Sequence, residues 1–229
     1  MRILSTKHLD SALTDRMRSH GVEIVCLDVL RIEQVEINPA DIPSGKYDAI
    51  AFTSSNAVRY GFTHQELHDL AVSKPVFAIS GKTNDALMRH GIISVGLAAD
   101  SQSLADVILY HNNVRSILHV CGDMSLEVLG DKLKTYNIRY DKLIGYHTAL
   151  LYPFIHGRFE AVMFYSPSGI DSFMKNNIPD QSATYCCIGE TTTKYLRSSY
   201  SSLEIITANE PAPDSMINKI IEHKKAKHD

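Results

Sequence analysis

The sequence predicts an α/β protein made of two similar parallel-sheet domains, joined by linker segments, with a cleft between the domains. Three observations support this fold class. Short apolar runs alternate with helix-length segments, two further runs are too long for an ordinary strand, and one stretch of sequence occurs twice. The chain of 229 residues is long for one domain and short for two large ones.

The alternation begins with a strand at residues 1–4 and a helix that Asp10 can cap and Gly21 can end. A strand followed by a helix-length segment then recurs along the chain. The further strands are expected at residues 47–52, 74–79, 92–97, 116–121, 159–165, 184–188 and 203–207. Strands that alternate with helices favour parallel sheets.

Two runs of β-friendly residues, 23–37 and 139–151, break this rhythm. Each can start in a sheet and finish as a connection, so the chain would leave its first domain, build a second one and return. The expected organisation is a discontinuous domain 1 at 1–28 plus 153–229, linker strands at 29–43 and 142–152, and an inserted domain 2 at 44–141.

An internal repeat indicates that one fold is used twice. Its clearest part aligns residues 48–58 with 160–170 and pairs Ser54 with Ser166 at an offset of 112. Two further pairs of segments repeat at an offset of 109: residues 76–83 with 185–192, and residues 100–108 with 209–217.

The repeated positions are polar where an expected strand ends and the next helix begins. Ligands of parallel α/β sheets usually bind at that edge, and free backbone N–H groups there can hold a carboxylate or phosphate. Helix capping alone would also explain many of these Ser, Thr and Asp residues. The five junctions are residues 54–56, 80–83, 121–123, 166–169 and 189–192. Two domains with the same kind of rim indicate a cleft for a large anionic ligand.

The composition excludes several classes of protein. With 23 basic and 26 acidic residues, the net charge of −3 gives no general reason to bind nucleic acid or a membrane. No apolar segment is long enough for a signal peptide or a membrane span.

The four cysteines lie in apolar runs without C-x-x-C spacing: Cys26, Cys121, Cys186 and Cys187. We therefore expect buried, reduced thiols and a cytoplasmic protein. The basic tail, residues 223–228, is expected to be a solvated helix end.

Two motifs that suggest other chemistry are incomplete. Residues 81–83 read Gly-Lys-Thr, like the end of a Walker A loop, but Val76 stands where its first glycine should be. His64 and His68 are four residues apart, but Glu66 is not where the H-E-x-x-H motif requires it, so an exposed helix face is expected. The residues alone therefore indicate a two-domain α/β protein with a polar, amide-rich cleft and no cofactor signature.

Across essentially the whole chain, an ordered set of motifs resembles the uroporphyrinogen-III synthase family of tetrapyrrole biosynthesis. The segments are residues 50–58, 118–123, 164–169, and 188–192 followed by 208–213. Tyr146 and Thr148 match the family's Y-x-T at the return linker. One departure is Ser80, where the family usually has glycine before the turn at Thr83.

The resemblance implies a fold of two α/β domains joined by a two-stranded β-ladder linker, which the two long runs would form. It also implies a hydro-lyase that acts on hydroxymethylbilane, a linear tetrapyrrole with an acetate and a propionate on each ring. The family's reaction removes the terminal hydroxyl as water, generates an azafulvene cation, and closes the ring with inversion of the last pyrrole through a spiro intermediate. Closure without inversion gives the type I isomer. No cofactor and no metal are implied.

Carried onto this chain, the resemblance makes Tyr146 the candidate general acid, because a tyrosine hydroxyl stays protonated at neutral pH. The alternative is a linker tyrosine that packs between domains. Thr83 and Thr192, which the repeat pairs, are expected to hold substrate carboxylates or the leaving water, with helix capping as the alternative. The expected substrate-binding residues are Ser54, Ser55, Asn56, Ser80, Gly81, Cys121, Gly122, Asp123, Ser166, Ser168, Gly169, Gly189 and Thr191.

Beyond the substrate, the expected partners are few. Hand-over of hydroxymethylbilane from hydroxymethylbilane synthase is one expectation, and a monomer without nucleic-acid or membrane partners is another. The main alternative function is a two-domain regulatory protein that binds a small anion or a tetrapyrrole without turnover.

Overall fold

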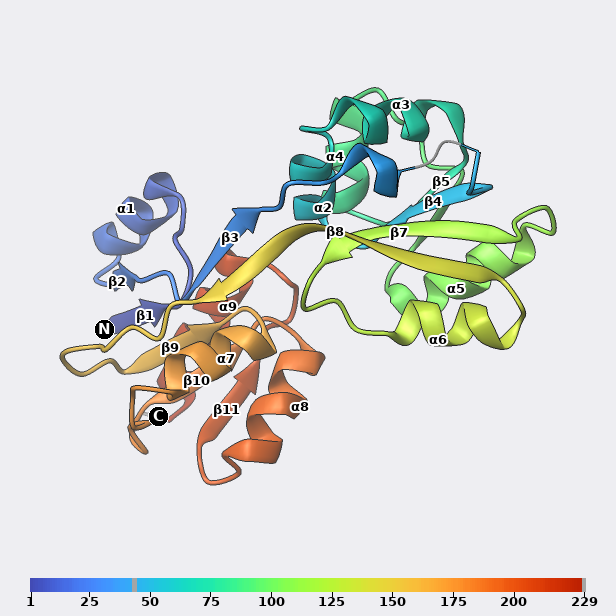
Figure 1. Ribbon diagram of the computed structural model, residues 1–229. Helices are drawn as coiled ribbons and strands as arrows, with labels where there is room; N and C mark the ends of the chain where they lie inside the picture. Colours follow the sequence, from blue (N-terminus) through green and yellow to red (C-terminus); the bar gives the residue numbers. More distant parts are fainter. Residues whose placement is uncertain (43–44, 228–229) are drawn as a thin grey trace. The chain divides into compact units, whose positions relative to one another are not determined.

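The computed structural model describes residues 1–42 and 45–227, and its chain forms two units, one of them discontinuous in sequence (Figure 1). Unit 1 consists of Met1–Arg31 and Ala149–Asp229, and unit 2 is Ile32–Thr148. Residues 43 and 44, where the linker was expected to end and the inserted domain to begin, lie outside the described residues. So does His228 of the basic tail.

Unit 1 contains a parallel sheet of five strands in the order β11-β10-β9-β1-β2. Its strands are β1 (Arg2–Ser5), β2 (Glu23–Cys26), β9 (Ala161–Phe164), β10 (Thr184–Cys187) and β11 (Glu204–Thr207). Its helices are α1 (Ser11–Ser19), α7 (Pro167–Met174), α8 (Glu190–Ser199) and α9 (Pro213–Ala226). Asp10 caps α1 as predicted, since its side chain accepts a hydrogen bond from the Ala12 N–H.

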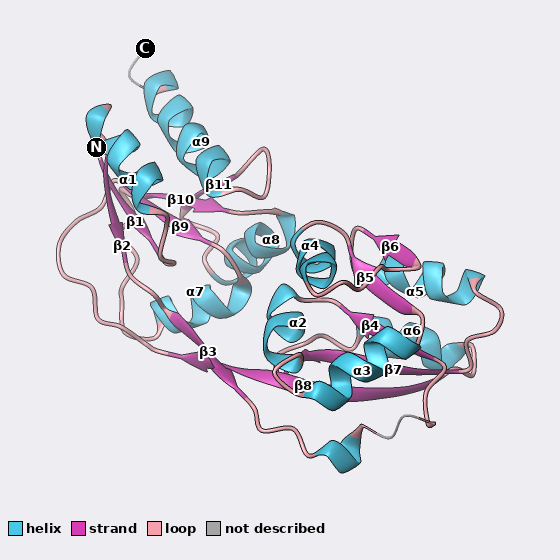
Figure 2. Ribbon diagram, turned by 90° about the horizontal axis from the view of Figure 1, so that it is seen from above, coloured by secondary structure: helices cyan, strands magenta, loops and turns pink. Residues whose placement is uncertain are grey.

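Unit 2 contains a sheet in the order β3-β8-β7-β4-β5-β6 (Figure 2), of which β4 to β8 pair in parallel. The strands of this sheet are β3 (Leu30–Gln34), β4 (Ala49–Phe52), β5 (Val76–Ile79), β6 (Gly96–Ala98), β7 (Ser116–Gly122) and β8 (Arg139–Leu150). The first two residues of β3 and the last two of β8 belong to unit 1. Its helices are α2 (Ser55–Gly61), α3 (Gln65–Ser73), α4 (Lys82–Arg89), α5 (Ser101–Tyr110) and α6 (Val128–Thr135), with a 3₁₀ turn η1 at Pro39–Asp41. The predicted α/β class with parallel sheets is confirmed.

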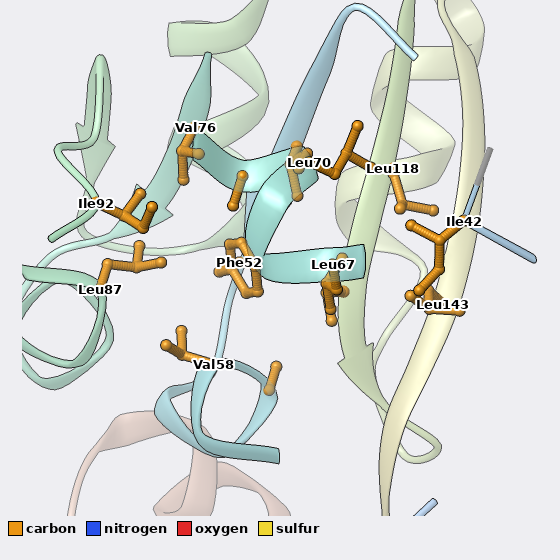
Figure 3. Close-up of a cluster of buried hydrophobic side chains, with 14 of the residues drawn as sticks. Ile42, Phe52, Val58, Leu67, Leu70, Val76, Leu87, Ile92, Leu118 and Leu143 are labelled. Atoms are coloured by element: carbon orange, nitrogen blue, oxygen red, sulfur yellow. The ribbon is translucent and has the colours of Figure 1, made fainter. Parts of the chain in front are cut away.

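Each central strand is buried on both faces, so its side chains alternate between two cores. In β4, Ile50 and Phe52 pack with helices α2, α3 and α4, whereas Ala49 and Ala51 pack with α5 and α6. Figure 3 shows Phe52 beside Val58 of α2 and Leu87 of α4. The continuous apolar run of this strand is therefore what a fully covered parallel strand requires.

The two sheets share one spatial order once the repeat is taken into account. The repeat pairs β4 with β9 and β5 with β10, and their neighbours β6 and β11 occupy the same next place. On the other side, β7 and β8 of unit 2 stand where β1 and β2 stand in unit 1. The repeated strands of unit 2 thus have the same spatial order as those of unit 1, but the chain enters that order at a different strand.

Several local expectations need correction. The expected strand at residues 92–97 is only β6, because Gly91, at φ 74°, ends α4 with a tight turn and the chain reaches the sheet edge at Gly96. The expected exposed face at His68 is wrong, since this side chain is 28% exposed and its ring packs edge-on against Phe62 and His90.

The basic tail is the exposed helix end that was expected at Lys225, Ala226 and Lys227, but two of its side chains also contact the sheet. Within the described part of the tail, α9 continues to Ala226, and both His223 and Lys227 form ion pairs with Glu204 of β11. Cys26, expected to be buried, is partly exposed, while Cys121, Cys186 and Cys187 are buried free thiols.

Candidate active site

The topology of each sheet marks one place for a ligand. In unit 2 the chain builds β5 and β6 on one side of β4 and places β7 and β8 on the other side. The carboxyl ends of β4 and β7 are therefore a topological switch point, where open α/β sheets bind ligands. In unit 1 the equivalent point lies at the carboxyl ends of β1 and β9.

At the switch point of unit 2, the structure brings Tyr146 and Ser54 together. The Tyr146 hydroxyl donates a hydrogen bond of 3.0 Å to Oγ of Ser54, which lies two residues after the end of β4. Burial raises the pKa of Tyr146, although the hydrogen bond with Ser54 acts in the opposite direction. The phenol is therefore held protonated, with its oxygen placed at the start of α2.

A β-bulge in β8 directs the Tyr146 side chain. The register between β7 and β8 shifts between Cys121 and Gly122, so that Gly122 pairs with Tyr146 and Gly145 is the extra residue. In a regular strand, Leu143 and Tyr146 would point to opposite faces because they are three residues apart. With the bulge, both pack against the same hydrophobic core.

Gly122 gives the tyrosine ring its space. A Cβ atom on Gly122 would lie 2.4 Å from Cζ and 2.7 Å from the hydroxyl oxygen of Tyr146. Only a residue without a side chain allows the ring to lie this close to the end of β7. The sequence predicted Gly122 as a substrate-binding residue, and the structure adds this packing role.

Ser54 has two structural functions at once. Its Oγ accepts hydrogen bonds from the Asn56 N–H at 3.2 Å and from Tyr146, so it caps α2 and anchors the phenol.

The preceding Thr53 hydroxyl bonds to Nε2 of buried His119 at 2.8 Å. Burial lowers the pKa of His119 to about 3, so this imidazole is neutral and serves as a bridge to the Tyr140 hydroxyl at 2.6 Å.

Asp123 holds the chain just beyond Tyr146. Its carboxylate accepts hydrogen bonds from the Thr148 N–H at 3.0 Å and from Nδ1 of His147 at 3.1 Å, and its own N–H donates to the Tyr146 carbonyl. Neighbouring Cys121 is fully buried, and burial raises the pKa of its thiol. Any contact of Cys121 with a ligand would therefore use its backbone.

At the next junction, after β5, the backbone adopts an unusual conformation at Gly81 rather than at Ser80. Gly81 has φ 75°, a conformation that glycine adopts easily, whereas Ser80 is not among the positive-φ residues of the described chain. Serine in place of the family's glycine is therefore compatible with this turn. The Thr83 residue is 5% exposed. Within the described residues its hydroxyl has no hydrogen-bond partner, and the hydroxyl oxygen remains accessible to solvent.

Unit 1 places the repeated residues in matching positions. Ser166 caps α7 by accepting a hydrogen bond of 3.1 Å from the Gly169 N–H, and its Oγ is 3.1 Å from Oγ of Ser168. After β10, Gly189 precedes α8 with extended backbone, and Thr191 is exposed in its first turn.

Thr192 of α8 resembles its repeat partner Thr83. The residue is 4% exposed. Across residues 1–42 and 45–227 its hydroxyl has no hydrogen-bond partner, and the hydroxyl oxygen is accessible to solvent. Thr83 and Thr192 therefore both place a hydroxyl without a partner in the described part of the chain in the first turn of a helix.

The sequence predictions omitted the end of β1. Ser5 and Tyr165 lie at the switch point of unit 1, with their hydroxyl oxygens 2.9 Å apart, and Ser5 also donates to the Lys7 carbonyl at 2.6 Å. Burial raises the pKa of Tyr165 far above its usual range. Tyr165 stands in the repeat opposite Thr53, so a hydroxyl in both copies was a signal that could have identified it.

Two further features are missing from the described residues. They hold no group of three His, Cys, Asp or Glu side chains placed to bind a metal ion. No helix in that part of the chain has the length and apolar character needed to cross a membrane.

Comparison with known proteins gives a consistent result. Uroporphyrinogen-III synthetase from Helicobacter pylori superposes with a TM-score of 0.69 and 17% identity, over 97% of this chain and 100% of that one. A mutant uroporphyrinogen III synthase from the extremely thermophilic bacterium Thermus thermophilus gives a TM-score of 0.68 and 13% identity, over 99% and 98% of the two chains. No curated protein matches the sequence.

The two solved structures show only a likeness of fold, whereas a family model assigns the chain to a family. The model described as uroporphyrinogen-III synthase HemD matches residues 11–218, which is most of the chain. The chain therefore belongs to the uroporphyrinogen-III synthase family, the hydro-lyases that close the tetrapyrrole ring in porphyrin and haem biosynthesis.

Proposed function

We propose that this chain converts hydroxymethylbilane to uroporphyrinogen III and that Tyr146 donates the proton to the departing hydroxyl. The observation that supports this role is the Tyr146 phenol, which is kept protonated by burial and is held by Ser54 at the switch point of unit 2. A general acid must have its proton at the working pH and a fixed position, and this phenol has both.

The proposed first step breaks the bond between the terminal carbon and its hydroxyl oxygen. The lone pair of the pyrrole nitrogen supplies the electrons, the Tyr146 proton goes to the oxygen, and water leaves an azafulvene cation. The cation then bonds to the substituted carbon of the last pyrrole and forms the spiro intermediate. The bond from that carbon to its original bridge breaks, and the bridge carbon bonds to the free carbon of the same pyrrole, which releases its hydrogen as a proton. That proton balances the one given up by the phenol, so the enzyme returns to its starting state without net change.

The remaining proposed roles concern binding. Ser54, Ser55, Asn56, Ser166, Ser168 and Gly169 would hold carboxylates mainly through backbone N–H groups, because the Ser54 and Ser166 side chains already cap helices. The free hydroxyls of Thr83 and Thr192 would bind carboxylates or the leaving water. Since binding is shared among many amides, removal of one side chain is expected to lower activity only modestly.

The surroundings of the enzyme are also proposed. Buried free thiols at Cys121, Cys186 and Cys187 fit a reducing compartment, so we place the protein in the cytoplasm. We further propose that it acts as a monomer and receives its unstable substrate from hydroxymethylbilane synthase.

The test of this function is product analysis. Freshly generated hydroxymethylbilane is supplied to the purified protein, and the oxidised porphyrin products are separated by isomer. We expect an excess of type III over the spontaneous type I product. Type I alone, at the uncatalysed rate and with folded protein, would contradict the proposed function and leave binding without turnover as the alternative.

A further inference from the structure

A groove lined by cations lies between α2 and α4 within unit 2. Ser55 and Asn56 at its end were predicted as site residues from the sequence, but Arg59 and Arg89 were not. These two helices pack against each other, as both ribbon views show (Figures 1 and 2). The groove has a volume of about 570 Å³ and is lined by one stripe of each helix: Ser55, Asn56 and Arg59 of α2, and Lys82, Ala86 and Arg89 of α4. His90 follows at its end.

The spacing of the three cations explains why they share one groove. Lys82 and Arg89 are seven residues apart, two turns of α4, and therefore lie on the same face of this helix. Arg59 is four residues after Ser55 on α2, so it also lies one turn along the face that lines the groove. Beneath them, Val58 and Leu87 are fully buried and fix the two helices on Phe52 (Figure 3).

These cations are not neutralised by the protein. Across residues 1–42 and 45–227, none of Arg59, Lys82 and Arg89 forms an ion pair, and no Asp or Glu lines the groove. Some other cations of unit 2 are paired, as Lys132 is with Asp106 and Lys142 is with Glu127. Three like charges around one hollow repel one another, so the groove is suited to a ligand that brings several negative charges.

The groove also begins at the candidate active site. Ser55 and Asn56 directly follow Ser54, whose Oγ accepts the hydrogen bond from Tyr146. A ligand in the groove would therefore extend from the residues that hold the proton donor toward Arg59 and Arg89. Guanidinium groups bind carboxylates through two parallel hydrogen bonds, which gives such a ligand a fixed orientation.

We propose that this groove binds clustered carboxylates and that, in the reaction, it holds acidic side chains of the tetrapyrrole substrate. The role of the groove in holding side chains of the substrate rests on the proposed function. The groove would hold substituents that do not react, so its contribution is equal in the ground state and the transition state. It should therefore affect KM and leave kcat unchanged.

The experiment compares two double variants that each remove two positive charges from unit 2. Arg59→Gln/Arg89→Gln empties the groove of its guanidinium groups. The matched control, Lys74→Gln/Arg115→Gln, removes cations that precede β5 and β7, at the opposite edge of the same sheet. Circular dichroism and thermal unfolding confirm that both variants fold.

Binding is measured by fluorescence with an octacarboxylate and a tetracarboxylate porphyrin, and turnover with hydroxymethylbilane. We expect the groove variant to raise the Kd of the octacarboxylate porphyrin and the KM about tenfold, with kcat unchanged and a weaker dependence of binding on salt. The control should change these values less than about twofold.

The outcomes separate this inference from the proposed function. If the groove variant and the control behave alike in both assays, the groove proposal is wrong even when the enzyme makes type III product. If the protein makes no type III product but loses porphyrin binding only in the groove variant, the function is wrong and the carboxylate site stands.

Discussion

A single glycine determines where the Tyr146 ring can lie. The added methyl group of Gly122→Ala would overlap the ring at 2.4 Å, and the ring would have to leave its hydrogen bond with Ser54. We expect this variant to lower kcat on the order of tenfold or more, because displacement of a catalytic group by about 1 Å is enough to do so. Overpacking should also lower the free energy of unfolding by about 1–3 kcal/mol.

The control for this variant is Gly45→Ala, which adds the same methyl group where no atom lies within 4 Å. It should leave kcat and the unfolding midpoint as they are in the wild type. Steady-state kinetics and urea unfolding measure both quantities. If Gly122→Ala retained the kcat of the wild type, the packing of Tyr146 on Gly122 would have no part in catalysis.

At the scale of residues, the sequence named candidate side chains for the site but not how they meet. Tyr146 and Ser54 were both expected at the site, yet they are 92 residues apart, and nothing local in the sequence states that one donates to the other. The role of Gly122 was equally hidden, because a glycine at a strand end is common in many turns. Contacts between distant segments depend on packing, which residue patterns do not specify.

At the scale of elements, β8 shows what sequence periodicity cannot reveal. Its long run of β-friendly residues predicted an extended strand, and the strand spans Arg139–Leu150. The bulge at Gly145, however, reverses the alternation and moves Tyr146 to the face of Leu143. A strict period of two would have placed Tyr146 on the wrong side of the sheet.

Helix α9 is attached to unit 1 through a carboxylate on β11. Glu204 accepts hydrogen bonds from the Thr184 hydroxyl at 2.7 Å and from His223 at 3.0 Å, and it pairs with Lys227. Burial alone would raise the pKa of Glu204, but the hydrogen bonds with Lys227, Thr184 and His223 outweigh it and lower the pKa to about 2. This network attaches the end of α9 to β11, although the Lys227 side chain remains half exposed.

The network predicts a pH-dependent contribution to stability. The pKa of Glu204 is lower in the folded state, so its contribution is complete above the ordinary value of 4.5 and is lost as the pH falls toward about 2. Glu204→Gln should therefore lower the free energy of unfolding at pH 7 by about 2 kcal/mol. Near pH 2 the variant and the wild type should be equally stable.

Urea unfolding at several pH values measures this difference. Glu210→Gln, at an exposed position in the loop before α9, is the control and should match the wild type at every pH. A deficit of Glu204→Gln that stayed the same from pH 7 to pH 2 would show that the carboxylate charge is not what stabilises α9.

At the scale of the whole molecule, the repeat was the most informative feature of the sequence. It predicted two parallel sheets with polar strand ends, and the polar ends of β4 and β9 lie at the switch points of their sheets. It could not reveal that the units start from different strands, nor that the first strand contributes Ser5 to the edge of unit 1. Those features arise from the discontinuous path of the chain rather than from local pattern.

The central claim is that the Tyr146 phenol supplies the proton that starts ring closure, and one substitution tests it most directly. Tyr146→Phe keeps the ring packed on Gly122 and removes only the hydroxyl, while Tyr136→Phe does the same at a site that is 62% exposed. We predict that Tyr146→Phe lowers kcat for type III product about 100-fold with KM nearly unchanged, and that Tyr136→Phe has no effect. Formation of type III product by Tyr146→Phe at the wild-type rate would contradict the account.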